Sequence, residues 1–260
     1  MPSPFEKDLA GLKEKLLIMA SHAETATRQA VEFLTERNEQ CAAEVKKNED
    51  VLDRFEVEVD EQAIQLLGRA SLAADFRLII VAMRISWNLE RIGDEASKIA
   101  KRARELLQEA PLKEVTGIPQ LADLALGLLK RALDAFVRLD SAVARALIPE
   151  DRKVDALNRE IYRALAAQMM EKPETVARAL NLMVAAKSLE RIADHLERNY
   201  IGPQKIAGCQ IAVSRHGHEA YSRSFGSMDL ERGKPMRDDA IFRIYSMTKP
   251  ITSVAAMMLY

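Results

Sequence analysis

Apolar residues recur every three or four positions along most of the first 200 residues, which is the spacing of amphipathic α-helices. Before residue 110 the pattern predicts three helices: 5–38, a second that ends at Gly68, and about 72–107. Pro111, Gly117 and Pro119 then interrupt it. The pattern then predicts three more helices, at 121–147, 149–170 and 173–199. Pro149 and Pro173 open the last two.

One short motif occurs twice, at positions 100 residues apart. Leu-Glu-Arg-Ile-Gly-Asp at 89–94 is matched by Leu-Glu-Arg-Ile-Ala-Asp at 189–194. Such a match indicates that one structural unit has been used twice. The sequence therefore predicts an all-α region over residues 1–200, made of two tandem three-helix bundles at 1–110 and 119–200 with a linker at 111–118.

The pattern changes near residue 201, where glycine and proline become frequent. Ile211 and Val213 alternate with small or polar residues, which predicts a short strand, and a second strand is expected at 221–225 after a turn. An extended piece at 241–244 and a helix that starts near Ser246 should follow. Residues 201–260 are therefore expected to form an incomplete α/β fragment of a different domain type.

Composition narrows the class of protein. The net charge of −1 gives no bulk attraction to nucleic acid or to an anionic membrane. The most apolar run, at 78–83, is far too short to cross a bilayer. Cys41 and Cys209 provide neither a disulfide framework nor zinc-ligand spacing. We therefore expect a cytoplasmic helical protein that does not bind nucleic acid.

The repeated motif carries a glutamate and an aspartate four residues apart, so both carboxylates project from one face of a helix. The helix before each motif carries another pair with this spacing. Four carboxylates from two neighbouring helices repel one another unless a cation is bound, and bundles are known to hold metals in this way. Oxygen-rich sites suit iron, magnesium, manganese or calcium. The candidate metal ligands are Glu49, Asp53, Glu90 and Asp94 in the first half, and Asp151, Asp155, Glu190 and Asp194 in the second.

A simpler interpretation of these pairs stays open. Glu and Asp four residues apart are common on helices and usually form a solvated face near Arg or Lys. Glu56 and Asp60 have the same spacing without a counterpart in the second half, so we assign them to this background. In this interpretation Arg91 and Arg191 neutralise the acids of the repeat, and no metal is bound.

Over about residues 5–200 the chain resembles the PhoU family of phosphate-signalling regulators. The resemblance rests on the helix layout, on Ala-Ala-Asp-Phe-Arg at 73–77 and on both Glu-Arg-Ile-x-Asp motifs. It implies a cytoplasmic, usually homodimeric adaptor that links the phosphate ABC transporter ATPase to the sensor histidine kinase of the phosphate regulon. Such an adaptor negatively regulates phosphate uptake and the regulon, and meets the membrane only through its partners. The resemblance also implies iron clusters on the paired acidic motifs, with magnesium, manganese or zinc as alternatives.

The tail, about residues 205–260, resembles the start of a serine hydrolase of the class C β-lactamase and esterase type. The likeness rests on Cys-Gln-Ile-Ala-Val-Ser-Arg-His-Gly at 209–217 and on Phe-Arg-Ile-Tyr-Ser-Met-Thr-Lys-Pro at 242–250. It implies Ser246 as the nucleophile and Lys249, one turn later, as its activating base. The sequence ends at Tyr260, before the other catalytic motifs of that family. We therefore expect an inactive tail and a protein that is not an enzyme.

Three functions are compatible with these observations. The leading interpretation is a metal-binding, PhoU-like regulatory adaptor that works by binding. The alternative is a Ser-x-x-Lys hydrolase of the β-lactamase or esterase type with a helical extension. The third is a helical scaffold that holds no metal.

Overall fold

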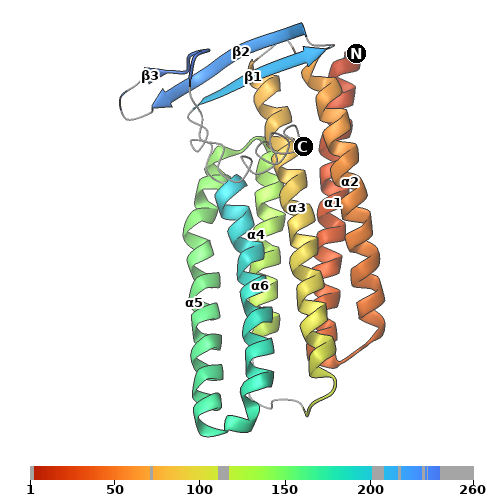
Figure 1. The fold of residues 1–260 in the computed structure, drawn as a ribbon, viewed down its shortest axis with the longest axis vertical. Helices are drawn as coiled ribbons and strands as arrows, with labels where there is room; N and C mark the ends of the chain where they lie inside the picture. Colours follow the sequence, from red (N-terminus) through yellow and green to blue (C-terminus); the bar gives the residue numbers. More distant parts are fainter. Residues whose placement is uncertain are drawn as a thin grey trace, which may run out of the picture. The chain divides into compact units, whose positions relative to one another are not determined.

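The computed structural model describes residues 3–70, 73–110, 117–200, 208–215, 218–229, 232 and 234–240, and the chain divides into two compact units at 1–202 and 203–260. In the first unit the described residues form long α-helices that run side by side (Figure 1), which confirms the predicted all-α fold. The helices are α1 (Pro4–Glu36), α2 (Gln40–Leu67), α3 (Ala73–Leu106), α4 (Ile118–Arg138), α5 (Ser141–Glu171) and α6 (Val176–Tyr200).

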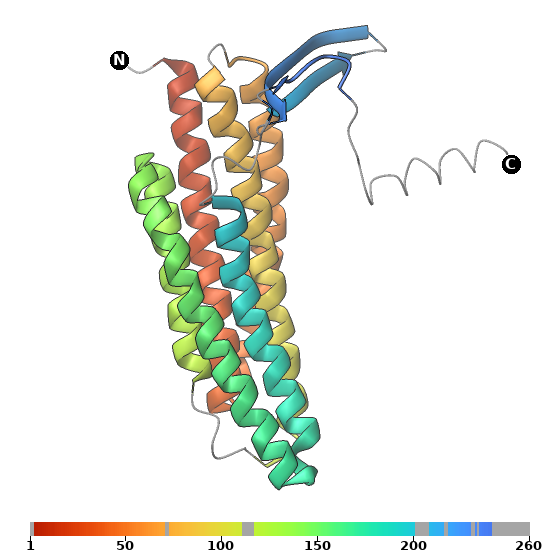
Figure 2. The ribbon, with the colours of Figure 1, turned by 90° about the vertical axis from the view of Figure 1, so that its left-hand side faces the viewer.

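Helices α1, α2 and α3 pack against one another, and so do α4, α5 and α6. The two sets meet where α3 packs on α6 and α1 on α4, and both views of the ribbon show them as one unit (Figures 1 and 2). Fully buried side chains from several helices fill the interior. The largest are Phe33, Leu12, Leu16, Met19, Leu52, Leu66, Ile79, Ile85, Leu89, Ile92, Ile99 and Ile118.

The contact between α3 and α6 is antiparallel. The side chains of Glu95 and Arg102 on α3, and of Glu109 shortly after it, lie within 3.6 Å of partners on α6. Those partners are Arg191, Asn181 and Arg178, so the residue numbers fall on α6 as they rise on α3. The two copies of the repeated motif therefore lie at the same level, and their leucines and isoleucines are all fully buried.

The ends of the first three helices follow from local chemistry. The Ser3 hydroxyl accepts from the backbone N–H of Glu6, and the Glu6 carboxylate accepts from the backbone N–H of Ser3, which is a capping box. Arg37 ends α1 in the left-handed region, at φ 61°. Gly68 caps α2, as its sequence position predicts. Helices α1 and α3 match the predicted ranges to within a few residues, and α2 ends where the sequence predicts.

The predicted boundary between the fourth and fifth helices is wrong. The sequence pattern places it between residues 147 and 149, whereas α4 ends at Arg138 and α5 runs straight through Pro149. Leu139 takes the left-handed conformation at φ 54°, and the Asp140 carboxylate accepts from the next two free backbone N–H groups. The N-cap of Asp140 thus decides where α5 begins, and the helix tolerates the interior proline.

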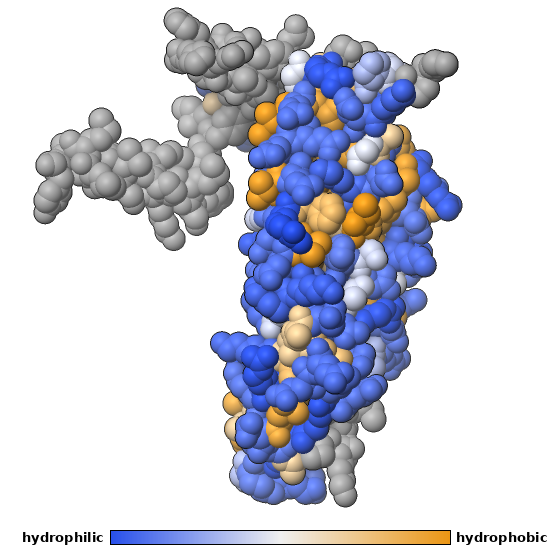
Figure 3. All heavy atoms as spheres, turned by 90° about the vertical axis from the view of Figure 1, so that its right-hand side faces the viewer, coloured by the Kyte–Doolittle hydropathy of each residue, from blue (hydrophilic) through white to orange (hydrophobic). Residues whose placement is uncertain are grey.

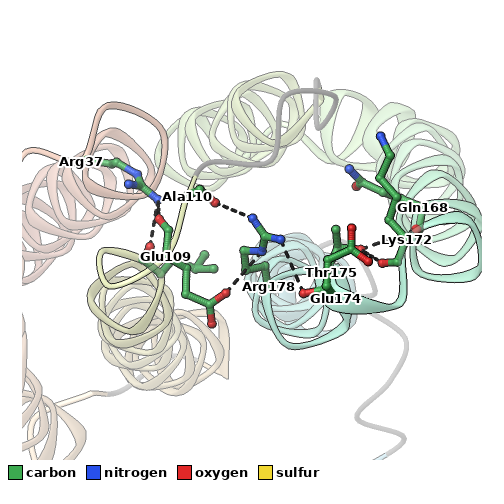
Figure 4. Close-up of polar contacts among 9 residues, drawn as sticks. Arg37, Glu109, Ala110, Gln168, Lys172, Glu174, Thr175 and Arg178 are labelled. Carbon is green, nitrogen blue, oxygen red and sulfur yellow. Dashed lines mark hydrogen bonds and ion pairs between the residues drawn. The ribbon is translucent and has the colours of Figure 1, made fainter.

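Two arginines hold the C-terminal end of α3 (Figure 4). Arg37, just after α1, donates to the carbonyl oxygens of Leu106 and Glu109. Arg178, on α6, donates to the carbonyl oxygen of Ala110 at 2.9 Å, and its Nε lies 3.3 Å from the Glu109 carboxylate. The last carbonyls of a helix lack partners within the helix and attract positive charge. Arg37 therefore binds the carbonyl of the last α3 residue, and both arginines hold the segment that follows it, from both halves of the unit.

The second unit contains a three-stranded antiparallel sheet among its described residues. Strand β1 (Gly208–Arg215) pairs with β2 (His218–Asp229), which pairs with β3 (Lys234–Pro235). The two predicted strands at 211–213 and 221–225 are confirmed. The extended piece at 241–244, Ser246 and Lys249 lie outside the described residues, as does most of the expected linker at 111–118. An α/β hydrolase-like fold for the tail stays a prediction.

The face of the helical unit drawn in Figure 3 is mainly hydrophilic. On the face in Figure 3, hydrophobic groups stand among charged residues and gather over its upper half. Exposed large apolar side chains on α1 and α2 are Leu17, Ile18, Val57 and Ile64. None of the helices in the described part of the chain is long and apolar enough to span a membrane.

Gly93, within the repeated motif, lets α2 approach α3 closely. A Cβ atom at this position would lie 2.6 Å from Cδ1 of Leu52, which is fully buried. The second copy has Ala193 here, buried at 1% exposure. The motif therefore accepts alanine on α6 but not, without repacking, on α3.

We predict that Gly93→Ala destabilises the chain by about 1 kcal/mol, because overpacking of about 1–3 kcal/mol exceeds the gain in helix propensity. Gly127 on α4 is a matched control, since a Cβ there would meet nothing within 4 Å. Gly127→Ala should stabilise by about 0.5–1 kcal/mol. Urea unfolding of both variants measures the difference, and a stabilised Gly93→Ala would contradict the close packing.

Candidate metal centre

The first acidic set lies on two packed helices. Glu49 and Asp53 are on α2, Glu90 and Asp94 on α3, and the two helices are in direct contact. Asp53 is exposed, but partial desolvation and then the charges of Glu49 and Asp94 raise its pKa. Glu90 responds in the same way to Asp94 and Asp53. The structure thus brings these four predicted residues into one electrostatic group, which we call the first acidic group.

Glu56 also belongs to the first acidic group, although the sequence pattern assigned it to background. Its charge acts on Glu90, and the charges of Asp60 and Asp53 act on it, so that burial and repulsion raise its pKa. Its position three residues after Asp53 places both on one face of α2. From the sequence, Glu56 was missed because the second half has no matching acidic pair. Its spacing from Asp53, which puts both side chains on one helix face, could have identified it.

Glu90 has a strongly raised pKa. Burial is the main cause, and the charges of Asp94, Glu56 and Asp53 add to it, so that the pKa of Glu90 rises from 4.5 to about 7. Arg91 opposes the shift only weakly. Near neutral pH this carboxyl is therefore half-protonated, and a bound cation would favour its ionised form.

The two arginines of the repeat each contact a residue outside it. The Arg91 guanidinium lies over the ring of Trp87, 4.4 Å from its centre. Arg191 lies 3.6 Å from Glu95 on the other helix. Lys46 does pair with Glu49, at 3.1 Å, and with the neighbouring Asp50. Positive charge therefore reaches the outer edge of the first acidic group.

Glu95 forms a different kind of site between α3 and α6. It is 4% exposed, and Lys98 lies 2.9 Å from its Oε1. Burial would raise its pKa, but hydrogen bonds from Ser188 and Lys98 and the charge of Arg191 outweigh burial and lower it. Glu95 is thus a paired, ionised carboxylate that joins the two halves.

The second acidic set has the same layout with more burial. Asp151 and Asp155 are on α5, and Glu190 and Asp194 on the neighbouring α6. Asp151 and Glu190 are 9% and 8% exposed, and the other two are half-buried. The Lys187 ammonium lies 2.5 Å from Oε2 of Glu190. We call these four residues the second acidic group.

The donor chemistry of both groups fits a hard or borderline cation, because all the side chains are oxygen donors. Two observations support this fit: the raised pKa of Glu90, and the buried Oδ1 of Asn158, three residues after Asp155 on α5, which lacks a hydrogen-bond partner. Within the described ranges, no three His, Cys, Asp or Glu side chains are arranged closely enough to hold a metal ion. The carboxylates would therefore have to rotate inward to bind one.

A model of the PhoU domain family matches residues 16–103 and 118–199, which is most of the helical unit. The chain belongs to the PhoU family. A Pseudomonas aeruginosa protein named phosphate-specific transport system accessory protein PhoU homolog is 35% identical over 193 residues, which is 74% of this chain and 80% of that protein. An Aquifex aeolicus protein of the same name is 34% identical over 186 residues, which is 71% of this chain and 84% of that protein.

Solved structures agree with this membership. The crystal structure of PhoU from Pseudomonas aeruginosa matches with a TM-score of 0.70 and 34% identity, over 75% of this chain and 95% of that one. The crystal structure of the phosphate transport system regulatory protein PhoU from Streptococcus pneumoniae matches with a TM-score of 0.69 over 75% of this chain and 92% of that one. At 21% identity this match shows a shared fold. A β-lactamase family model matches residues 193–260, in keeping with the resemblance of the tail.

The raised pKa of Glu90 predicts a pH-dependent effect of its substitution. Because the folded-state pKa of about 7 exceeds the ordinary 4.5, ionised Glu90 destabilises the metal-free fold increasingly as pH rises between these values. Glu90→Gln should therefore raise the unfolding free energy by about 1–2 kcal/mol at pH 8, after allowance for solvent screening, and by little at pH 4.5.

Urea unfolding in chelator at both pH values measures this effect. Glu160→Gln, an exposed carboxylate on α5, is the matched control and should change little. A Glu90→Gln protein that is less stable than the parent at pH 8 would show that the carboxylate is paired and not repelled.

Proposed function

We propose that the protein is a PhoU-like negative regulator of phosphate uptake and phosphate-regulon signalling that binds metal ions through its two acidic groups. The observation that carries the proposal is the like-charge group on α2 and α3, where burial first, and then the charges of Asp94, Glu56 and Asp53, raise the pKa of Glu90 to about 7. Membership of the PhoU family and the names of relatives as phosphate-specific transport system accessory proteins support the phosphate role.

In the first centre, Glu49, Asp53, Glu90 and Asp94 would hold the cation, with Glu56 near enough to contribute. In the second, Asp151, Asp155, Glu190 and Asp194 would do so. A bound cation supplies positive charge that relieves repulsion between carboxylates and ties the two helices of each pair together. Iron clusters are the expected occupants, and manganese, magnesium or zinc suit the same oxygen donors.

The protein would act by binding and not by turnover. We propose that it works in the cytoplasm as a homodimer, between the ATPase of the phosphate ABC transporter and the sensor histidine kinase of the regulon. Metal binding would set the spacing of α2 against α3 and of α5 against α6, and so the surface offered to those partners. Ser246 and Lys249 of the tail have no part in this mechanism.

Metal content tests the binding step. The full chain, purified without chelator, should carry several equivalents of iron, manganese, zinc or magnesium by plasma mass spectrometry. Glu90→Ala with Asp94→Ala should lose the share bound at the first centre, because half of its ligands are removed. Glu160→Ala with Glu171→Ala removes two exposed carboxylates and should lose nothing. Equal metal content in all three proteins would contradict the assignment of the first centre.

A reporter assay tests the regulatory step. In a bacterial strain that lacks its own PhoU-family regulator, a phosphate-regulon reporter is active even in phosphate-rich medium. Expression of the full chain should repress it, and the Glu90→Ala, Asp94→Ala protein should repress it several-fold less at equal abundance. Full repression by that variant would show that regulation does not require metal binding at the first centre. A parent chain that fails to repress would contradict the phosphate role itself.

A further inference from the structure

Asn158 on α5 is a buried polar residue with an unmet hydrogen bond. The residue is 8% exposed, and its Oδ1 is buried without a hydrogen-bond partner. A buried acceptor without a donor costs free energy, and native structures rarely keep one without a reason. An ion or an ordered water would satisfy it.

The repeat places Asn158 in the second acidic group. It follows Asp151 and Asp155 at i+7 and i+3, so all three share one face of α5. On α2, Glu56 follows Asp53 by the same three residues, and its charge acts on Glu90 of the facing helix. Asn158 thus occupies the position in the second half that Glu56 holds in the first.

The packing of α5 on α6 supports this placement. The Tyr162 hydroxyl donates to the Met183 carbonyl oxygen at 3.1 Å, which fixes the level of the two antiparallel helices. One turn further along each helix, Asn158 comes level with Lys187, whose ammonium lies 2.5 Å from Glu190. The Asn158 oxygen therefore lies at the level where positive charge already meets the buried Glu190.

We propose that Asn158 is a specificity-determining ligand of the second centre, and supplies a neutral carbonyl oxygen where the first centre has the carboxylate of Glu56. This inference rests on the proposed metal binding. The two centres then differ by one negative charge, because Asn replaces Glu in otherwise matching sets. A neutral amide oxygen is a common ligand of hard divalent cations, and less negative charge favours a divalent over a trivalent ion. The second centre should therefore prefer divalent cations more strongly than the first.

The test isolates the second centre in the full chain with Glu90→Ala and Asp94→Ala. Mn²⁺ is the probe, and its free concentration is followed by electron paramagnetic resonance. Adding Asn158→Leu should weaken Mn²⁺ binding about 10-fold or more, the usual loss when a ligand-shell residue is removed. Adding Asn158→Asp should tighten it, because the new ligand is charged. Gln168→Leu, which removes a half-buried amide elsewhere on α5, should leave it unchanged.

Thermal unfolding of the metal-free proteins separates a ligand from a structural residue. Asn158→Leu removes an unpaired buried acceptor and should raise Tm by roughly 2–4 °C in chelator. A fall in Tm with unchanged Mn²⁺ affinity would show a purely structural amide and overturn the inference. Absence of Mn²⁺ uptake in the parent of this series would overturn the second centre and this inference together, while leaving the first centre to its own test.

Discussion

The antiparallel packing of α3 on α6 is the contact on which the rest of the helical unit depends. The apolar positions of both motif copies are fully buried in the helical core, and Glu95, Arg102 and Glu109 pair with residues of α6 along the shared length. Because the same short motif also carries the acids, the core that joins the two halves fixes where those carboxylates lie. Burial of leucine and isoleucine on one face of the helix therefore sets the acids on another.

The acidic groups destabilise the helical unit that this packing holds together. In the first group, burial and then like charges on α2 and α3 raise the pKa of Glu90 to about 7. Gly93 brings the two helices closer than an alanine would allow. A metal-free protein therefore holds a strained electrostatic arrangement at neutral pH. Arrangements of this kind are typical of sites that await a ligand, and they also occur in structural ion-pair networks. Glu95, by contrast, is a buried acid that stays ionised, because hydrogen bonds from Ser188 and Lys98 and the charge of Arg191 outweigh its burial.

The sequence predicted the helical fold well because helix periodicity is a strong signal over long segments. The repeat also identified the paired acids, since one motif returned on matching helices. The α4–α5 boundary was missed because Leu139 takes a left-handed conformation that usually marks glycine, and because Pro149 looked like a helix start. Glu56 was missed because the second half has asparagine there, and Asn158 because only acidic residues were considered. In both cases the residue is recognised as part of the site only from its position relative to the neighbouring helix, which the sequence does not show.

Anomalous X-ray diffraction from crystals of the full chain grown with Mn²⁺ tests the central claim most directly. The account predicts one anomalous peak or cluster between α2 and α3, within bonding distance of Glu90 and Asp94, and another between α5 and α6 beside Glu190 and Asp194. Crystals with saturating Mn²⁺, no peak at either position and carboxylates paired with lysine or arginine would contradict it. The acidic pairs would then be a charged face of a helical scaffold.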